Sequence, residues 1–331
     1  MRKFLKVSII VLLILANAAA VTIAIIQYGQ YDGYRVTPSG KPLIGEKLNL
    51  TVPDSSDTEA LKLFAYNLYA AANENFKNLE NAAYAVNSVT TTMGTPVYGY
   101  RHVVKNADEY LYLEYSFVPE TLLGALVGAV SKASTKFAER SYTNASMDYL
   151  YSEKTLEPTH TLCENEIIYH ADWENLYFAK QKQKPVYCAD QEADFEYTDQ
   201  KIRPETIQTV SVTYNEQEGY YRLEMELDVN EPFTTSITLP NLRENSGSDN
   251  AAYTSMREVI EIWDNGYYKY FLSEDAWEGT LTEPIRMNLS SDIRFETDFL
   301  YDQNSLSFSH YQYAEDFISL VNSGNMRSVG E

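Results

Sequence analysis

Histidine is scarce in this chain, and the common catalytic motifs are missing. Only four of the 331 residues are histidines, and none is followed by glutamate, which excludes the H-E-x-x-H zinc signature. The chain has no G-x-S-x-G elbow, no Walker loop, no dinucleotide fingerprint and no complete EF-hand loop. We therefore expect a non-catalytic protein without a cofactor or a bound metal.

Basic residues are also few, with 26 Lys and Arg against 47 Asp and Glu. Arg2, Lys3 and Lys6 lie in the first six residues, where there is no acid, so the rest of the chain carries a net charge of −24. Such a surface repels nucleic acid and anionic lipid headgroups. It suits cations, basic peptides or neutral ligands, and we expect no nucleic-acid partner.

Long apolar runs are absent except at one place. Val7 to Ile26 contains twenty residues without a charge, which as a helix would be about 30 Å long and would match a bilayer core. The basic residues before it predict a cytoplasmic N-terminus. The sequence thus predicts a cytoplasmic tip (1–6), a transmembrane signal anchor (7–27) that places residues 7–26 in the bilayer, and an extracytoplasmic remainder at the cell membrane.

A cleaved signal peptide is the alternative for this run. Ala16-Asn17-Ala18 resembles a cleavage site, but cleavage there would leave the apolar stub 19–26 as the mature start. An uncleaved anchor uses all of these residues and is the favoured interpretation. No cysteine follows the run closely, which excludes a lipid anchor.

Cys163 and Cys188 are the two cysteines of the chain. Beyond the anchor they would lie in an oxidising compartment, so we expect a disulfide, which would stabilise the fold by roughly 3 kcal/mol. A zinc site formed with His160 and His170 is a weaker alternative, because the spacings match no zinc module well.

The remaining pattern predicts an α+β fold, with a mainly antiparallel β-sheet ectodomain packed on one long amphipathic helix. Glycines and prolines mark 28–57 as a linker, with one short strand at 48–52. Ser56 to Glu59 resembles a capping box that opens a helix, whose apolar stripe continues from Leu61 to Ala83. We expect a single domain over 58–331, with a flexible loop at 241–250. The predicted strands are 97–105, 109–117, 136–142, 146–152, 166–170, 173–180, 206–214, 220–229, 257–263, 267–272, 277–281, 292–301 and 305–311, and a short helix at 313–321 closes the chain.

Two predicted hairpins share a Gly-Tyr-Tyr-basic run, at Gly219 to Arg222 and at Gly266 to Lys269. Asp264-Asn265-Gly266 is strong turn chemistry, because Asn and Gly tolerate positive φ. The two runs predict two similar hairpins in one large sheet.

An apolar segment, Leu122 to Val130, interrupts the strand pattern. It is too short to span a bilayer as a helix, so it is a short buried helix, a loop that dips into the membrane, or a lid over an apolar cavity. An antiparallel sheet on one long helix with an apolar flap resembles, in outline, the half-barrel carriers of lipids and lipoproteins. This likeness is architectural, rests on no motif, and implies an apolar cargo. The candidate binding residues are Leu122, Leu123, Leu126, Val127, Trp173, Trp263 and Trp277.

These observations predict a single-pass, membrane-anchored extracytoplasmic protein that binds an apolar ligand or a protein partner of the envelope. One alternative is a structural component of an envelope assembly. Another is a cell-surface glycoside hydrolase, because carboxylates flank two tryptophans and such enzymes use paired carboxylates. The candidate acids for that reaction are Asp172, Glu174, Glu274, Asp275 and Glu278.

Overall fold

The computed structural model describes residues 39–92, 94–106, 109–117, 136–143, 147–152, 186–189, 201–281 and 286–301. Side chains are described for 39–92, 94–105, 201–280 and 286–301. Within these ranges no helix has the length and the apolar character needed to cross a membrane. The predicted anchor, the apolar segment 122–130, Cys163 and Trp173 lie outside the described residues, as do His160, His170, Asp172, Glu174, the predicted strands 166–170, 173–180 and 305–311, and the closing helix.

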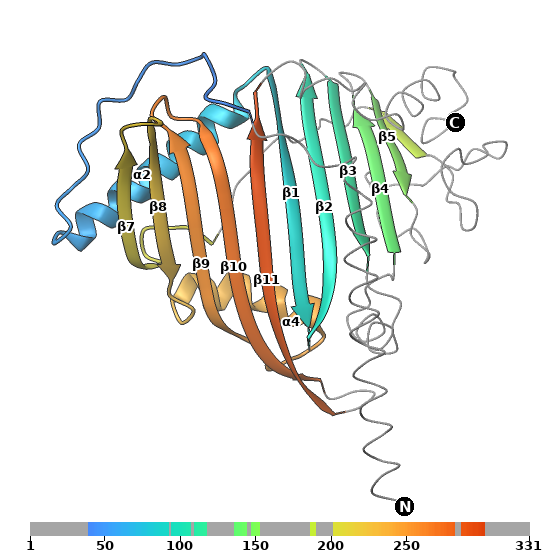
Figure 1. Cartoon of the computed structure of the whole chain (residues 1–331). Coiled ribbons are helices and arrows are strands. Elements are labelled where there is room, and N and C mark those ends of the chain that lie inside the picture. The colour runs from blue at the N-terminus through green and yellow to red at the C-terminus, as the bar shows by residue number, and fades with distance from the viewer. Residues whose placement is uncertain are drawn as a thin grey trace, which may run out of the picture.

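Eleven antiparallel strands form one sheet (Figure 1). Their spatial order is β6-β5-β4-β3-β2-β1-β11-β10-β9-β8-β7, so the two ends of the strand sequence meet where β1 pairs with β11. This confirms the predicted α+β class and the antiparallel sheet. The strands are β1 (Asn81–Thr92), β2 (Thr95–Asn106), β3 (Glu109–Phe117), β4 (Lys136–Thr143), β5 (Met147–Ser152), β6 (Val186–Ala189), β7 (Ile207–Asn215), β8 (Tyr220–Leu227), β9 (Ala252–Trp263), β10 (Tyr268–Leu281) and β11 (Met287–Leu300).

Helix α2 (Thr58–Lys77) packs across one face of the sheet, as its apolar stripe predicts. Asp57 is the N-cap, and its carboxylate accepts a hydrogen bond from the Ala60 N–H, one residue later than the predicted capping box implies. The prediction that the stripe runs to Ala83 is wrong, because the helix ends at Lys77 and Ala83 belongs to β1. Alanine is tolerated in a buried strand, and Ala82 and Ala83 are both fully buried there.

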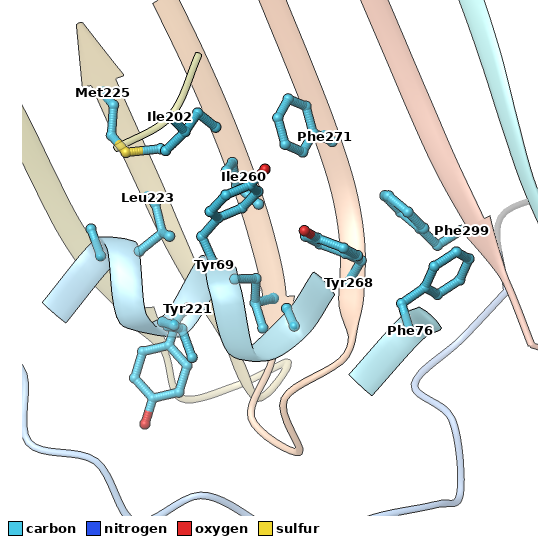
Figure 2. Packing of buried hydrophobic residues seen from close by; sticks show 14 of the residues in the cluster. Tyr69, Phe76, Ile202, Tyr221, Leu223, Met225, Ile260, Tyr268, Phe271 and Phe299 are labelled. Carbon is cyan, nitrogen blue, oxygen red and sulfur yellow. The ribbon is translucent and has the colours of Figure 1, made fainter. Parts of the chain in front are cut away.

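The core lies between α2 and the strands beneath it (Figure 2). Phe76 is fully buried and meets Phe299 edge-to-face at 5.1 Å between ring centroids. Tyr268 stacks on Phe299 at 4.6 Å, and Tyr69 reaches Phe271 edge-to-face. Such aromatic pairs contribute about 0.5–1.5 kcal/mol each beyond the area that they bury. The Tyr-rich composition therefore serves the core as well as half-exposed strands.

A second, smaller core lies under helix α4 (Leu239–Ser246), which follows a single π-helical turn, η2 (Thr234–Thr238). Leu242 packs with Ala251, Trp277 and Leu289. The prediction of a flexible loop over 241–250 is wrong for its first half. Polar residues dominate this short helix, which buries Leu242, so its apolar stripe is too short to be recognised in the sequence.

Residues 39–57 contain no helix or strand, so the predicted strand at 48–52 is wrong. This segment, which we call the strap, is nevertheless docked on the β9–β10 turn. The Asn265 side-chain amide donates to the carbonyls of Pro42 and Ile44, both at 2.8 Å, and the Leu48 N–H donates to the Asp264 carbonyl. The Asn265 side chain and one main-chain hydrogen bond of the turn thus take the place of strand pairing.

Both predicted Gly-Tyr-Tyr-basic hairpins are present, and their runs lead into β8 and β10, the two strands that flank β9. Gly219 and Gly266 have φ of +74° and +82°, which glycine adopts without strain. The predicted strands 267–272 and 277–281 are one continuous strand, β10, because Ser273 to Ala276 pair with both neighbours. That stretch contains charged residues, so its hydrophobic pattern does not indicate a strand.

Candidate functional site

Strands β8 to β11 present two different faces, because successive side chains of a strand point in opposite directions. Along β8, Tyr221, Leu223 and Met225 are buried in the core that α2 covers. Arg222, Glu224 and Glu226 alternate with them on the other side of the sheet. We call the first side the helix-covered face, and the opposite side of β8 to β11 the charged face. In Figure 1 the helices lie behind the strands, so the charged face is turned toward the viewer.

Strand register places four charges of the charged face in one row. Glu226 pairs with Arg257, Arg257 with Glu274, and Glu274 with Arg294, each on the adjacent strand. The Arg257 Nη1 donates to Glu274 at 2.7 Å, and Arg294 donates to the other oxygen of the same carboxylate. Glu274 is thus held between two guanidinium groups. The row alternates in sign, which is the favourable arrangement for cross-strand neighbours.

A groove of about 680 Å³ follows this row across six strands, from β7 to β1. Its carboxylates outnumber its guanidinium groups: five acids and two arginines line it, although the Asp275 side chain turns to the other side of the sheet and binds Lys201 there. The acids are Glu226, Asp228, Glu274, Asp275 and Asp292, and the arginines are Arg257 and Arg294. Both arginine side chains remain more than 40% exposed. The groove is therefore an open, negatively charged surface and not an enclosed apolar cavity.

A second charged cluster lies nearer the hairpin turns. Glu261 accepts from Arg222 and from the Lys269 ammonium, both at 2.7 Å. Lys269 Nζ also lies 3.7 Å from the centre of the Tyr220 ring and 5.4 Å from that of Trp263. Cation–π contacts of this kind contribute about 0.5–1 kcal/mol at exposed sites. The cluster lies at the end of the charged face that is next to the β7–β8 and β9–β10 turns.

These contacts shift several pKa values. The hydrogen bond from Arg222 lowers the pKa of Glu224, and Arg257 adds to the effect. Burial lowers the pKa of Lys269, but its hydrogen bond and charge interaction with Glu261 outweigh burial, so the net pKa is raised. Asp298 shows the opposite trend for an acid, because burial and the charge of Glu296 raise its pKa. The face thus contains carboxylates with shifts of both signs.

The helix-covered face has a charged cluster of its own, and it is buried. Lys201 Nζ lies 2.8 Å from Asp275 and 3.1 Å from Glu258, and it donates to the Ser273 hydroxyl at 3.1 Å. Glu258 is fully buried and the Lys201 side chain is 14% exposed. Lys201 neutralises two carboxylates that would otherwise be buried without a cation. This cluster holds the segment before β7 against the sheet.

The structure does not bring Trp263 and Trp277 together. Trp263 lies on the charged face, edge-to-face with Tyr220 at 6.1 Å, and it is 8% exposed. Trp277 lies on the helix-covered face under α4 and is 7% exposed. The proposal that they bind a ligand stays a prediction, as does the role of Leu122, Leu123, Leu126, Val127 and Trp173. Cys188 lies in β6, and its pairing with Cys163 also remains a prediction.

The carboxylates around Trp277 do not converge as a glycosidase pair. Glu274 belongs to the charged face and binds Arg257 and Arg294, whereas Asp275 belongs to the helix-covered face and binds Lys201. Among the described residues, no group of three His, Cys, Asp or Glu side chains is placed to hold a metal ion. The row of charges was not identified in the sequence, although its signal is present there: charges recur at every second residue of β8.

Comparison with known proteins does not assign this chain to a family. No protein-family model matches the chain, and no curated protein matches it. Among solved structures, one similar chain is an outer membrane lipoprotein-sorting protein domain from Vibrio parahaemolyticus. It shares 9% sequence identity over 77% of this chain and 98% of that domain, with a TM-score of 0.19. That value assigns neither a fold nor an activity to this chain.

Proposed function

We propose that this protein is a membrane-anchored, extracytoplasmic binding protein that binds a basic protein partner through its charged face. The observation that carries the proposal is the groove along the row Glu226, Arg257, Glu274 and Arg294. Its excess of carboxylates complements a basic surface, and its two arginines offer guanidinium donors to acidic groups of the same partner.

Charge on this face favours specificity and fast association over raw affinity. Interactions between exposed charges are screened over about 8–10 Å at physiological salt. Binding to the groove should therefore weaken as salt is raised, and the alternation of sign should exclude uniformly acidic partners. The apolar-ligand version of the function depends on residues 122–130, and nothing in the groove favours it.

Photo-crosslinking from the groove tests the proposal in cells. Ser255 is exposed and lines the groove, so a photoreactive residue at this position should give one discrete crosslinked protein. The same residue at Glu244, exposed on α4, is the matched control and should give none. Equal patterns from the two positions would contradict binding through the charged face.

A charge variant then separates binding from folding. Asp292→Lys changes an exposed acid of the groove, and it should weaken the crosslink from Ser255. Glu244→Lys makes the same change of charge on α4 and should leave the crosslink unchanged.

Deletion of residues 2–27 tests the anchor, since the truncated chain should leave the membrane fraction.

A further inference from the structure

Strand β7 is the outermost strand at one end of the sheet (Figure 1). It pairs with β8 on one side, and no strand in the described part of the chain pairs with it on the other. No backbone hydrogen bond from a described residue reaches that outer side between Gln208 and Tyr214. Alternate N–H and C=O groups of an edge strand point outward, so this edge is a template for another strand.

The sequence of β7 does nothing to block such pairing. Ile207–Asn215 contains no charged residue, no proline and no glycine. Natural edge strands are usually protected by lysine, proline or bulges. The one irregularity in its register lies between Ile207 and Thr209, and the strand pairs regularly from Thr209 to Asn215.

The strand is complementary to itself around Ser211. In an antiparallel pair of two copies centred on Ser211, Val210 lies opposite Val212 and Thr209 lies opposite Thr213. Val210 and Val212 share the side of the core, where both pack against it, whereas Thr209, Ser211 and Thr213 are exposed. Each face of one copy thus continues into the same face of the other, and no like charges lie directly opposite.

The charged face continues across this pair with matching sign. Thr209 lies beside Glu226 and donates to it at 3.2 Å, and Thr213 lies beside Arg222. The centred pairing therefore aligns Glu226 of one copy, through two threonines, with Arg222 of the other. Threonine pairs across strands are themselves favourable.

From this geometry we propose that β7 is a self-association edge, through which two copies of the chain join in an antiparallel pair about a two-fold axis at Ser211. The contact is isologous, so it closes at a dimer. It extends the sheet from eleven strands in one copy to a continuous sheet across both. This inference goes beyond the proposed function and does not depend on it.

Disulfide trapping tests the register. In the full-length chain in its native membrane, Ser211→Cys places two thiols directly opposite each other, within reach of a disulfide. Mild oxidation should give a dimer on a non-reducing gel. Thr213→Cys is the matched control, because its thiol lies opposite Thr209 and about 13 Å from its symmetry mate, and it should remain monomeric. The parent chain accounts for crosslinks through Cys163 and Cys188.

A charge at the same position tests the dimer itself. Ser211→Lys faces Glu224 on its own β8 but places two lysines opposite each other across the axis. It should raise the dimer dissociation constant at least about tenfold in sedimentation of the detergent-solubilised chain. Ser290→Lys, an exposed change on β11, should leave that constant unchanged.

A parent chain that sediments as a monomer at every concentration, with no Ser211→Cys dimer, would overturn the proposal. The edge would then be open to an extended segment of a different protein. Equal trapping by Ser211→Cys and Thr213→Cys would equally contradict the register. Circular dichroism of each variant shows that a lost dimer is not a lost fold.

Discussion

The helix-covered face and the charged face are built from the same strands but stabilise the protein in different ways. On β9, Ile260 and Ile262 enter the core under α2, and between them Glu261 binds Arg222 and Lys269. Among the described residues, the Lys201 cluster on the first face is buried, whereas the row on the second face, with Arg257 and Arg294, is largely exposed. Stability should therefore depend on the helix-covered face, and recognition on the charged face, where surface pairs contribute little to folding.

The largest effect is expected at the centre of the aromatic core. Phe76→Ala removes a fully buried ring that contacts Tyr84, Phe299 and Tyr301, and it should cost about 3–5 kcal/mol of unfolding free energy. Chemical denaturation of the full-length chain measures this. Phe295→Ala, a partly exposed ring on the same face, is the control and should cost much less.

The buried ion cluster should give the next largest effect. Lys201→Met leaves Glu258 and Asp275 without their cation, and we expect a loss of about 3 kcal/mol at neutral pH. The loss is expected because two buried carboxylates would then face each other without a cation. A loss well below this value would show that packing of the lysine stem, and not its charge, holds the segment.

Asp298 makes a smaller, pH-dependent test of the charged face. Its pKa is raised in the folded protein by burial and by Glu296, so ionisation at neutral pH costs stability. That cost disappears as the pH falls through the raised pKa toward the ordinary value. Asp298→Asn should thus be more stable than the parent at pH 7, and the difference in melting temperature should vanish as the pH falls below the ordinary aspartate pKa. Asp292→Asn, exposed on the same strand, provides the comparison.

The smallest effect is expected for the row of exposed charges. Arg257→Met breaks the contacts with Glu274 and Glu224, but its side chain is 41% exposed, so unfolding free energy should change by less than about 1 kcal/mol. The same variant should weaken the crosslink from Ser255. If it destabilised the fold as much as Lys201→Met, the distinction between the two faces would be lost.

Patterns of apolar residues were sufficient to predict the elements that bury one face. The period of the stripe in α2 and the alternation in β7 and β8 both come from contact with the core, so they are visible in the sequence. The sequence extends the helix stripe to Ala83 because alanine suits a helix stripe as well as a buried strand, and only the pairing of Ala83 with β2 and β11 decides between them. Local sequence does not contain that information.

The candidate site was harder to predict, because it arises from strand order. Glu226, Arg257, Glu274 and Arg294 are up to 68 residues apart, and they form a row only through the register of β8 to β11. Likewise, Glu274 and Asp275 looked like a pair in the sequence, yet they lie on opposite faces. Adjacent residues of a strand never share a face, so proximity to a tryptophan was a poor guide.

The docked strap bears on the length of the tether that the predicted anchor would leave to the sheet. The Tyr301 N–H donates to the Ser39 hydroxyl, and Lys41 forms an ion pair with Asp264. The predicted 28–57 spacer is therefore already in contact with the sheet at residue 39. If residues 7–26 span the bilayer, only 27–38 can act as a leash, and twelve extended residues reach about 40 Å. The β9–β10 turn would then stay within one leash length of the lipid surface, so partners would meet this protein close to the membrane.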